Sequence, residues 1–144
     1  LYAPPAVPAA ARSLANTLLE AVGSVVWVDS EAELDAVTAV SGSGPAYFFL
    51  LMELLEAAAI AEGLAPAVAR QLALDTAAGA ARLAAISKDD PATLRAQVTS
   101  KGGTTAAAIA VLEAADLRGI VARAVAAAAR RSRELAAEFG RDPG

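Results

Sequence analysis

Alanine occupies 41 of the 144 positions, mostly within long segments that glycine and proline separate. Alanine is the strongest helix former, and its small side chain lets helix backbones approach one another closely. A chain of this length is about the size of one domain. The composition therefore predicts an all-α fold, an Ala-rich helical bundle.

The first thirty residues hold the one segment with strand character. Residues 8–22 suit a helix that Gly23 ends, and Val25 to Asp29 (VVWVD) is rich in β-branched and aromatic residues. A single strand cannot pair its own backbone groups in a sheet. We therefore expect this strand to pair with a part of the protein outside the sequence or across an oligomer.

Helix signals follow one another through the rest of the chain. Ser30 and Glu33 have the spacing of a capping box, and Asp90 and Asp116 are candidate N-caps. The helices predicted from these signals and from the prolines cover residues 30–40, 45–62, 66–87, 91–99, 104–113 and 117–139.

The helix after Pro45 is apolar around most of its circumference, with Glu53 and Glu56 as its only charges before Ile60. Such a helix is normally buried on several sides. We expect a two-fold dimer to cover it, and the alternative is that Ala-rich faces are tolerated in water. Glu53 and Glu56 fit a wet strip or dimer contacts better than a general acid pair.

Composition excludes several kinds of chemistry. The chain has no cysteine and no histidine, so thiolate or imidazole metal sites and histidine-based nucleophile systems are absent. Its net charge is −4 with scattered Lys and Arg, which predicts no binding to nucleic acid or membrane. Asp89 and Asp90 indicate a helix cap rather than a metal site. We predict no metal site.

The ends and the longest uncharged run bear on location. The chain starts at Leu1 with no signal-peptide pattern, and the run from Ala36 to Met52 is interrupted by Ser-Gly-Ser-Gly-Pro. We expect a cytoplasmic protein, and the missing initiator methionine suggests a fragment.

Gly42 and Gly44 resemble the start of a dinucleotide-binding turn, but the pattern fails. Tyr47 stands where the third glycine should be, and Pro45 removes an N–H that would face the pyrophosphate. No second strand follows. We interpret the turn as a break between two helices.

A second glycine pair lies in Val98 to Glu113 (VTSKGGTTAAAIAVLE), where two glycines precede two threonines and a predicted helix. A helix start exposes unpaired N–H groups and a partial positive charge, and hydroxyls on Ser100, Thr104 and Thr105 add donors. The segment suits a carboxylate or phosphate, although a simple capped helix start has the same pattern.

Two segments together, SGSGPAYFFLLMELLEAAAIAEGL and DPATLRAQVTSKGGTTAAAIAVLE, resemble the C-terminal domain of the pyrroline-5-carboxylate reductase family. The resemblance covers roughly Glu33 to Leu135. It implies an intertwined dimer of the type seen in the C-terminal domain of 6-phosphogluconate dehydrogenase. It also implies that residues 1–32 are the last helix and strand of an incomplete dinucleotide-binding (Rossmann) domain, followed by a dimerisation and substrate-binding domain over 33–144.

The resemblance also implies an activity, the reduction of 1-pyrroline-5-carboxylate to L-proline with NADPH or NADH. Ser100, Gly102, Gly103, Thr104 and Thr105 would hold the substrate carboxylate. Thr105 would be the candidate catalytic residue, reaching the ring nitrogen or the nicotinamide. This chain alone is expected to be inactive.

The family resemblance places a further contact at the first glycine turn, where Ser43, Gly44 and Pro45 would lie near the nicotinamide. One departure is Lys101, where many members have proline. It either adds attraction for a carboxylate or marks a different acid substrate. Two other functions stay open: a helical dimerisation module without chemistry, and a reductase of a related imine or keto acid.

Overall fold

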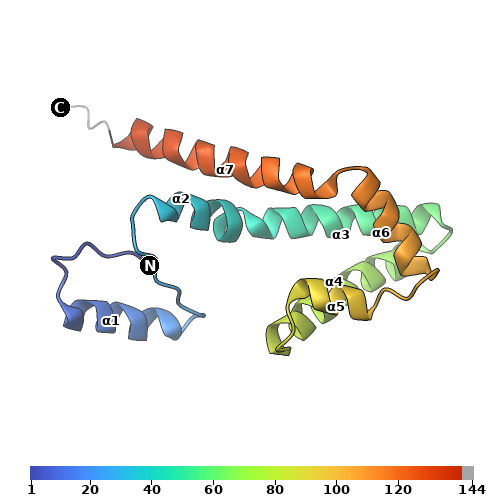
Figure 1. Ribbon diagram of the computed structural model, residues 1–144, viewed down its shortest axis with the longest axis horizontal. Helices are drawn as coiled ribbons and strands as arrows, with labels where there is room; N and C mark the ends of the chain where they lie inside the picture. Colours follow the sequence, from blue (N-terminus) through green and yellow to red (C-terminus); the bar gives the residue numbers. More distant parts are fainter. Residues whose placement is uncertain (141–144) are drawn as a thin grey trace. The chain divides into compact units, whose positions relative to one another are not determined.

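The computed structural model describes residues 1–140, and this part of the chain is helical, without strands (Figure 1). Its elements are α1 (Ala9–Glu20), α2 (Glu33–Val37), the π-helical turn η1 (Thr38–Gly42), α3 (Gly44–Ala61), α4 (Pro66–Ile86), α5 (Pro91–Gln97), α6 (Thr104–Ala114) and α7 (Leu117–Phe139). The predicted all-α class is confirmed. Residues 141–144, the end of the predicted second domain, lie outside the described residues.

The chain divides into two compact units. The first unit joins Leu1–Gly44 to the part of α7 from Ala122 onward, and the second is Pro45–Val121.

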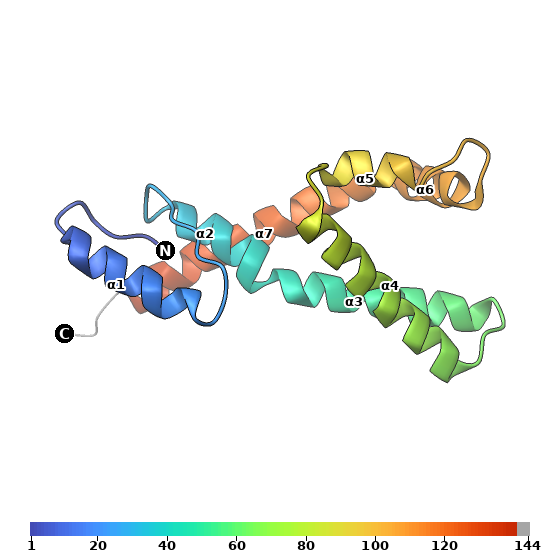
Figure 2. The ribbon, with the colours of Figure 1, turned by 90° about the horizontal axis from the view of Figure 1, so that it is seen from below.

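In the first unit, the later part of α7 crosses α2 (Figures 1 and 2). Ala39 of η1 is completely buried. The segment after α1 is tied back to that helix, because the Trp27 indole N–H donates to Asn16 Oδ1 at 3.1 Å and the Arg12 guanidinium lies over the Trp27 ring. Trp27 therefore packs the extended segment against the helix.

The predicted strand over Val25–Asp29 is not formed within the described residues, and its expected pairing with a part outside this sequence stays a prediction. The segment is extended and makes two backbone hydrogen bonds to the first residue. Val28 N–H donates to the Leu1 carbonyl, and the Leu1 amino group donates to the Val26 carbonyl. Neighbouring strands are needed to form a sheet, and the described chain supplies only one residue beside this segment.

The predicted helix break at the first glycine turn is wrong, because the chain forms a π-helical turn there. Ser43 N–H donates to the Thr38 carbonyl at 2.8 Å, a bond that spans five residues and closes a π-helical turn, and α3 begins at the next residue. Proline inside a regular helix loses its bond to residue i−4 and clashes with that carbonyl. The wider turn ahead of Pro45 lets the chain stay helical through this point.

Several helix ends form as the sequence predicted. The Asp90 carboxylate accepts a bond from Thr93 N–H at 2.8 Å, which lowers the pKa of Asp90 and caps α5. Asp116 caps α7 by accepting from Gly119 N–H at 3.2 Å. A Cβ on Gly119 would meet the Asp116 carboxylate oxygen at only 2.2 Å, so this cap depends on glycine.

The second unit is built on a helical hairpin of α3 and α4, seen in Figure 2 as two rods joined at one end. At the joint, Gly63 has φ +96°, its N–H donates to the Ile60 carbonyl, and Leu64 N–H donates to the Ala59 carbonyl. These two bonds form a Schellman C-cap, in which glycine takes the left-handed conformation. The predicted stop at Gly63 is confirmed.

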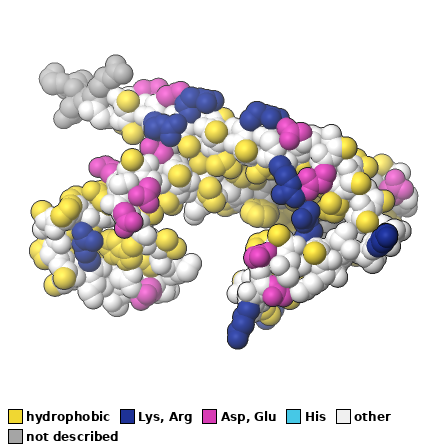
Figure 3. Space-filling view, in the orientation of Figure 1, with side chains coloured by type: hydrophobic (Ala, Val, Ile, Leu, Met, Phe, Trp, Pro, Cys, Tyr) yellow, Lys and Arg dark blue, Asp and Glu magenta, His cyan; other side chains and the backbone are white. Residues whose placement is uncertain are grey.

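Small side chains are the buried ones in this hairpin. Ala69 and Ala73, one turn apart on α4, are almost completely buried, whereas Phe48 and Phe49 of α3 are 62% and 66% exposed. Among the described residues, no large apolar side chain is fully buried. Hydrophobic side chains are accordingly visible over much of the surface in Figure 3.

One helical stretch, Glu33–Ala61, has the length and apolar composition of a membrane-crossing helix, with a mean hydropathy of 1.4 and little burial. The expectation that glycines would interrupt this run is overturned by the π-helical turn. A core helix that other parts of a protein bury can have the same length and apolar composition.

The Gly63 cap leads to a prediction about stability. Gly63→Ala is expected to lower the free energy of unfolding by about 1 kcal/mol, because a Cβ is strained at positive φ. Gly79→Ala, inside α4 with nothing within 4 Å of the added Cβ, is the matched control and should raise stability by roughly 0.5–1 kcal/mol. Urea titration of both variants measures this, and equal effects would contradict the assignment of the cap.

Candidate functional site

The second glycine pair lies in the loop of residues 98–103, which joins α5 to α6 within the second unit. Gly103 N–H donates to the Ser100 carbonyl at 3.1 Å, and Gly102 has φ +73°. Ser100 to Gly103 therefore make a tight turn with a left-handed third residue, a position that favours glycine. The two glycines serve different purposes, since Gly103 has an ordinary φ.

Gly103 is required by space rather than by backbone angle. A Cβ at this position would meet Ser100 Oγ at 2.5 Å and the Ser100 carbonyl oxygen at 3.3 Å. The absence of a side chain lets the Ser100 hydroxyl sit against the backbone at the N-cap of α6. Ser100 is thereby placed beside the helix start, as the sequence analysis proposed for a binding loop.

The start of α6 has free donors. Gly103 is the N-cap and no side chain caps the helix. Within residues 1–140, the N–H groups of Thr104, Thr105 and Ala106 have no acceptor, and the first intrahelical bond comes from Ala107 N–H. Three convergent N–H groups at the positive end of a helix attract an anion. We call residues Ser100–Thr105 with these N–H groups the anion loop.

The hydroxyls around the anion loop differ in exposure. Ser100 and Thr104 are exposed, and Thr105 is half-buried on the helix. All five predicted loop residues are thus brought together at one helix start. Thr99, just before them, is occupied, because its hydroxyl donates to the Arg95 carbonyl at 2.6 Å.

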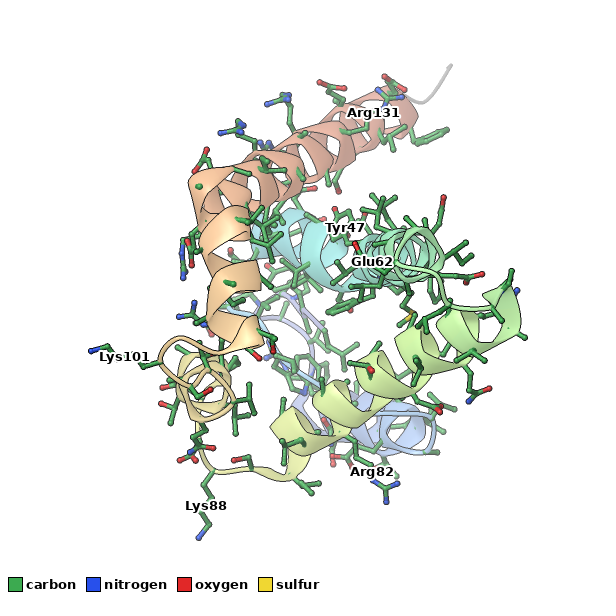
Figure 4. All side chains as sticks on the ribbon, turned by 90° about the vertical axis from the view of Figure 1, so that its right-hand side faces the viewer. Tyr47, Glu62, Arg82, Lys88, Lys101 and Arg131 are labelled. Carbon is green, nitrogen blue, oxygen red and sulfur yellow. The ribbon has the colours of Figure 1, made fainter. Side chains whose placement is uncertain are left out.

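Lys101 contributes less to attracting an anion at the start of α6 than its charge suggests. Its side chain is exposed and points away from the helices, as Figure 4 shows. In the face shown in Figure 3, basic and acidic side chains alternate, and no broad basic patch marks a nucleic-acid surface.

The Ser43–Pro45 turn spans the division between the two units, which falls after Gly44. Ser43 N–H is used by the Thr38 carbonyl, Gly44 is buried, and Pro45 has no N–H. The half-buried Ser43 hydroxyl is a polar group that remains for a ligand. Since Ser43 and Pro45 offer no free N–H group, the turn has fewer donors than a phosphate-binding loop.

The sequence analysis missed a groove between α3 and α4. Its cavity is about 360 Å³, and it is lined by Phe49, Met52, Glu53, Glu56, Ala57 and Ile60 of α3 with Arg70 and Leu74 of α4. The spacing of the α3 residues at three and four positions was a usable signal. No metal-binding group of His, Cys, Asp or Glu occurs among the described residues.

The family described as pyrroline-5-carboxylate reductase dimerisation matches residues 31–135 of the chain. The chain belongs to this family. A pyrroline-5-carboxylate reductase from Pseudomonas aeruginosa is 51% identical over 140 residues, which are 97% of this chain and 51% of that relative. One from Pisum sativum is 43% identical over 129 residues, covering 88% of this chain and 47% of the relative.

Solved structures give the same family. The pyrroline-5-carboxylate reductase from Coxiella burnetii superposes with a TM-score of 0.89 at 44% identity, over 93% of this chain and 50% of that one. The Plasmodium falciparum pyrroline carboxylate reductase, solved with NADP bound, superposes with a TM-score of 0.81 at 29% identity, over 91% of this chain and 50% of its own. The chain spans about half the length of the relatives it matches.

A substitution tests the geometry of the anion loop. Gly103→Ala is expected to weaken binding of a small carboxylate such as L-proline roughly tenfold, because the added Cβ displaces Ser100 from the helix start and removes about one hydrogen bond. Titration followed by amide chemical shifts measures the affinity. Gly79→Ala is the control, and equal affinity in the two variants would show that the anion does not bind here.

Proposed function

We propose that this chain is the substrate-binding and dimerisation part of a reductase that converts 1-pyrroline-5-carboxylate to L-proline. Two observations support the proposal: the free N–H groups at the start of α6, and membership in a family named for this reductase. Residues 33–144 would form the dimerisation domain, and residues 1–32 would be the end of a dinucleotide-binding domain. The complete protein would act in the cytoplasm.

The anion loop would hold the substrate carboxylate. The N–H groups of Thr104, Thr105 and Ala106 and the hydroxyls of Ser100 and Thr104 can all donate to carboxylate oxygens, and Gly102 and Gly103 let the ligand approach the backbone. No cation within the loop points at this position, since Lys101 points outward. Carboxylate binding would therefore depend on dipoles and hydrogen bonds.

The reaction asks little of side-chain acids or bases. A protonated cyclic imine is already a good hydride acceptor, so the protein's task is to hold the ring in position. Thr105 is half-buried on the first turn of α6, next to the carboxylate donors. We assign its hydroxyl to the ring nitrogen or the nicotinamide, which makes it the catalytic residue of this half of the protein.

The nicotinamide cofactor, NADPH or NADH, supplies the hydride when bound. The Ser43 hydroxyl, Gly44 and Pro45 fit a contact with the uncharged nicotinamide end, because the Ser43 N–H is already used and Pro45 has none, which leaves few donors for phosphates. The phosphates would be held by a domain outside this chain.

The exposed apolar helices support a homodimer, or a larger assembly built from it. Each leucine-sized side chain that a second chain covers contributes about 1.5–3 kcal/mol. The α3–α4 groove, with its apolar walls and three charged side chains, has the character of an interface rather than of a catalytic pocket.

Thr105→Val in a full-length protein that carries this chain tests the role of the hydroxyl. The expected result is a loss of kcat/KM of at least about tenfold, because valine keeps the shape and removes the donor. Steady-state kinetics with 1-pyrroline-5-carboxylate measures the loss, and circular dichroism checks the fold. Thr76→Val, an exposed threonine on α4, is the matched control.

Other outcomes distinguish the alternatives. An active Thr105→Val variant would remove the threonine from the mechanism. A wild-type protein that dimerises without reducing any cyclic imine would favour an assembly module. Preference for another imine or keto acid in a substrate panel would favour the related reductase.

A further inference from the structure

The anion loop has few internal bonds to fix its direction. Apart from the Ser100–Gly103 turn, the loop is anchored through the residue before it, Thr99. The Thr99 N–H donates to the Ala96 carbonyl, and the Thr99 hydroxyl donates to the Arg95 carbonyl. Both bonds run back into α5. The place of the loop relative to the α6 N–H groups therefore depends on how α5 lies against α6.

The helix α5 is too short to hold itself in place. It has seven residues, from Pro91 to Gln97, and isolated helices shorter than about 12 residues are marginal in water. Its N-terminal side is fixed by the Asp90 cap and by Gln97, whose side-chain amide donates to Asp89 Oδ2 at 2.8 Å. Neither contact reaches α6.

One carboxylate connects the helices on both sides of the loop. Arg95 Nη1 of α5 lies 3.3 Å from Glu113 Oε1 of α6. The same carboxylate accepts from Arg118 at the start of α7, with Nε 2.9 Å from Oε2 and Nη2 2.6 Å from Oε1. The three residues, called the Arg95–Glu113–Arg118 cluster below, all belong to the second unit.

The fork from Arg118 orients the Glu113 carboxylate, which the single Arg95 contact then reaches from α5. A two-bond arginine–carboxylate contact fixes the orientation of the carboxylate, whereas most single surface ion pairs are mobile and weak. Arg118 itself follows the Asp116 cap at the corner between α6 and α7. Hydrogen bonding by Arg118 lowers the pKa of Glu113 against the opposing effect of desolvation, and the charges of Arg118 and Arg95 lower it further, so the carboxylate stays ionised at neutral pH.

We propose that the Arg95–Glu113–Arg118 cluster is a positioning group for the substrate, which sets the anion loop by fixing α5 against α6. The inference rests on the proposed function of that loop. Arg95 lies five residues before Ser100, so the position of α5 sets where the anion loop begins. Loss of the carboxylate also leaves two guanidinium groups facing each other, which pushes α5 away.

Glu113→Gln in a full-length protein that carries this chain is the principal test. We expect the KM for 1-pyrroline-5-carboxylate to rise about three- to tenfold, with the KM for the nicotinamide cofactor and the thermal midpoint unchanged. A purely structural role would instead lower the thermal midpoint and leave the substrate KM unchanged. Glu138→Gln is the matched control, because Glu138 forms a comparable exposed pair with Arg131 at 2.9 Å on α7.

Two variants of Arg95 refine the test. Arg95→Met should raise the substrate KM as Glu113→Gln does, and Arg95→Lys should restore part of the loss, because lysine keeps the charge without the planar fork. In the double variant, the two effects should not add. Full additivity would overturn the proposal, since it would show that the residues act independently.

Amide hydrogen exchange separates this inference from the proposed function. Glu113→Gln should speed exchange of the hydrogen-bonded amides of Thr99 and Gly103 and leave α4 unchanged, even if the protein reduces a different substrate. An inactive wild type would count against the proposed function alone. Unchanged loop exchange together with an unchanged substrate KM would overturn the positioning role alone.

Discussion

The main physical constraint on this structure is that one chain buries little apolar volume. In the part of the chain that the structure describes, the buried hydrophobic residues are three alanines, while the phenylalanines and leucines of α3 remain exposed. Alanine contacts allow helices to approach but remove little apolar surface from water. Helix caps, the Schellman turn and a few ion pairs define local geometry, so the exposed apolar surface needs a cover that the described residues do not supply.

The candidate site can form despite the small buried core, because residues close together in sequence set its geometry. The anion loop takes its shape from one turn, two glycines and the uncapped start of α6, all close together in sequence. Short-range features of this kind form without a large core. The Asp116–Gly119 contact and the Arg95–Glu113–Arg118 cluster then fix the directions of the helices that carry the loop.

Sequence reasoning succeeded where a structure is specified by neighbouring residues. Gly63 predicted the end of α3, Asp90 predicted the start of α5, and the Gly-Gly-Thr-Thr pattern predicted an exposed helix start. Each of these features depends on a few adjacent residues with well-defined backbone preferences. The family resemblance was drawn from the same two segments and is confirmed over residues 31–135.

Sequence reasoning failed where the outcome depends on more distant partners or on competing backbone choices. VVWVD has strand propensity, but propensity cannot supply the neighbouring strand that is missing. The glycines before Pro45 permit both a break and a wide helical turn, and the π-helical bond from Ser43 to Thr38 decides between them. Glu113 and Arg95 are 18 positions apart, so their pairing was not visible as a local pattern. The spacing of the α3 residues was a usable signal for the groove, but its second wall comes from α4.

Sedimentation equilibrium over a range of protein concentrations tests the central claim, that a second copy completes this fold. The account predicts a dimer or a larger even-numbered assembly at micromolar concentration. It also predicts an unfolding midpoint that rises with protein concentration, as mass action requires when folding and association are linked. A monomer whose unfolding midpoint is independent of concentration would contradict the account.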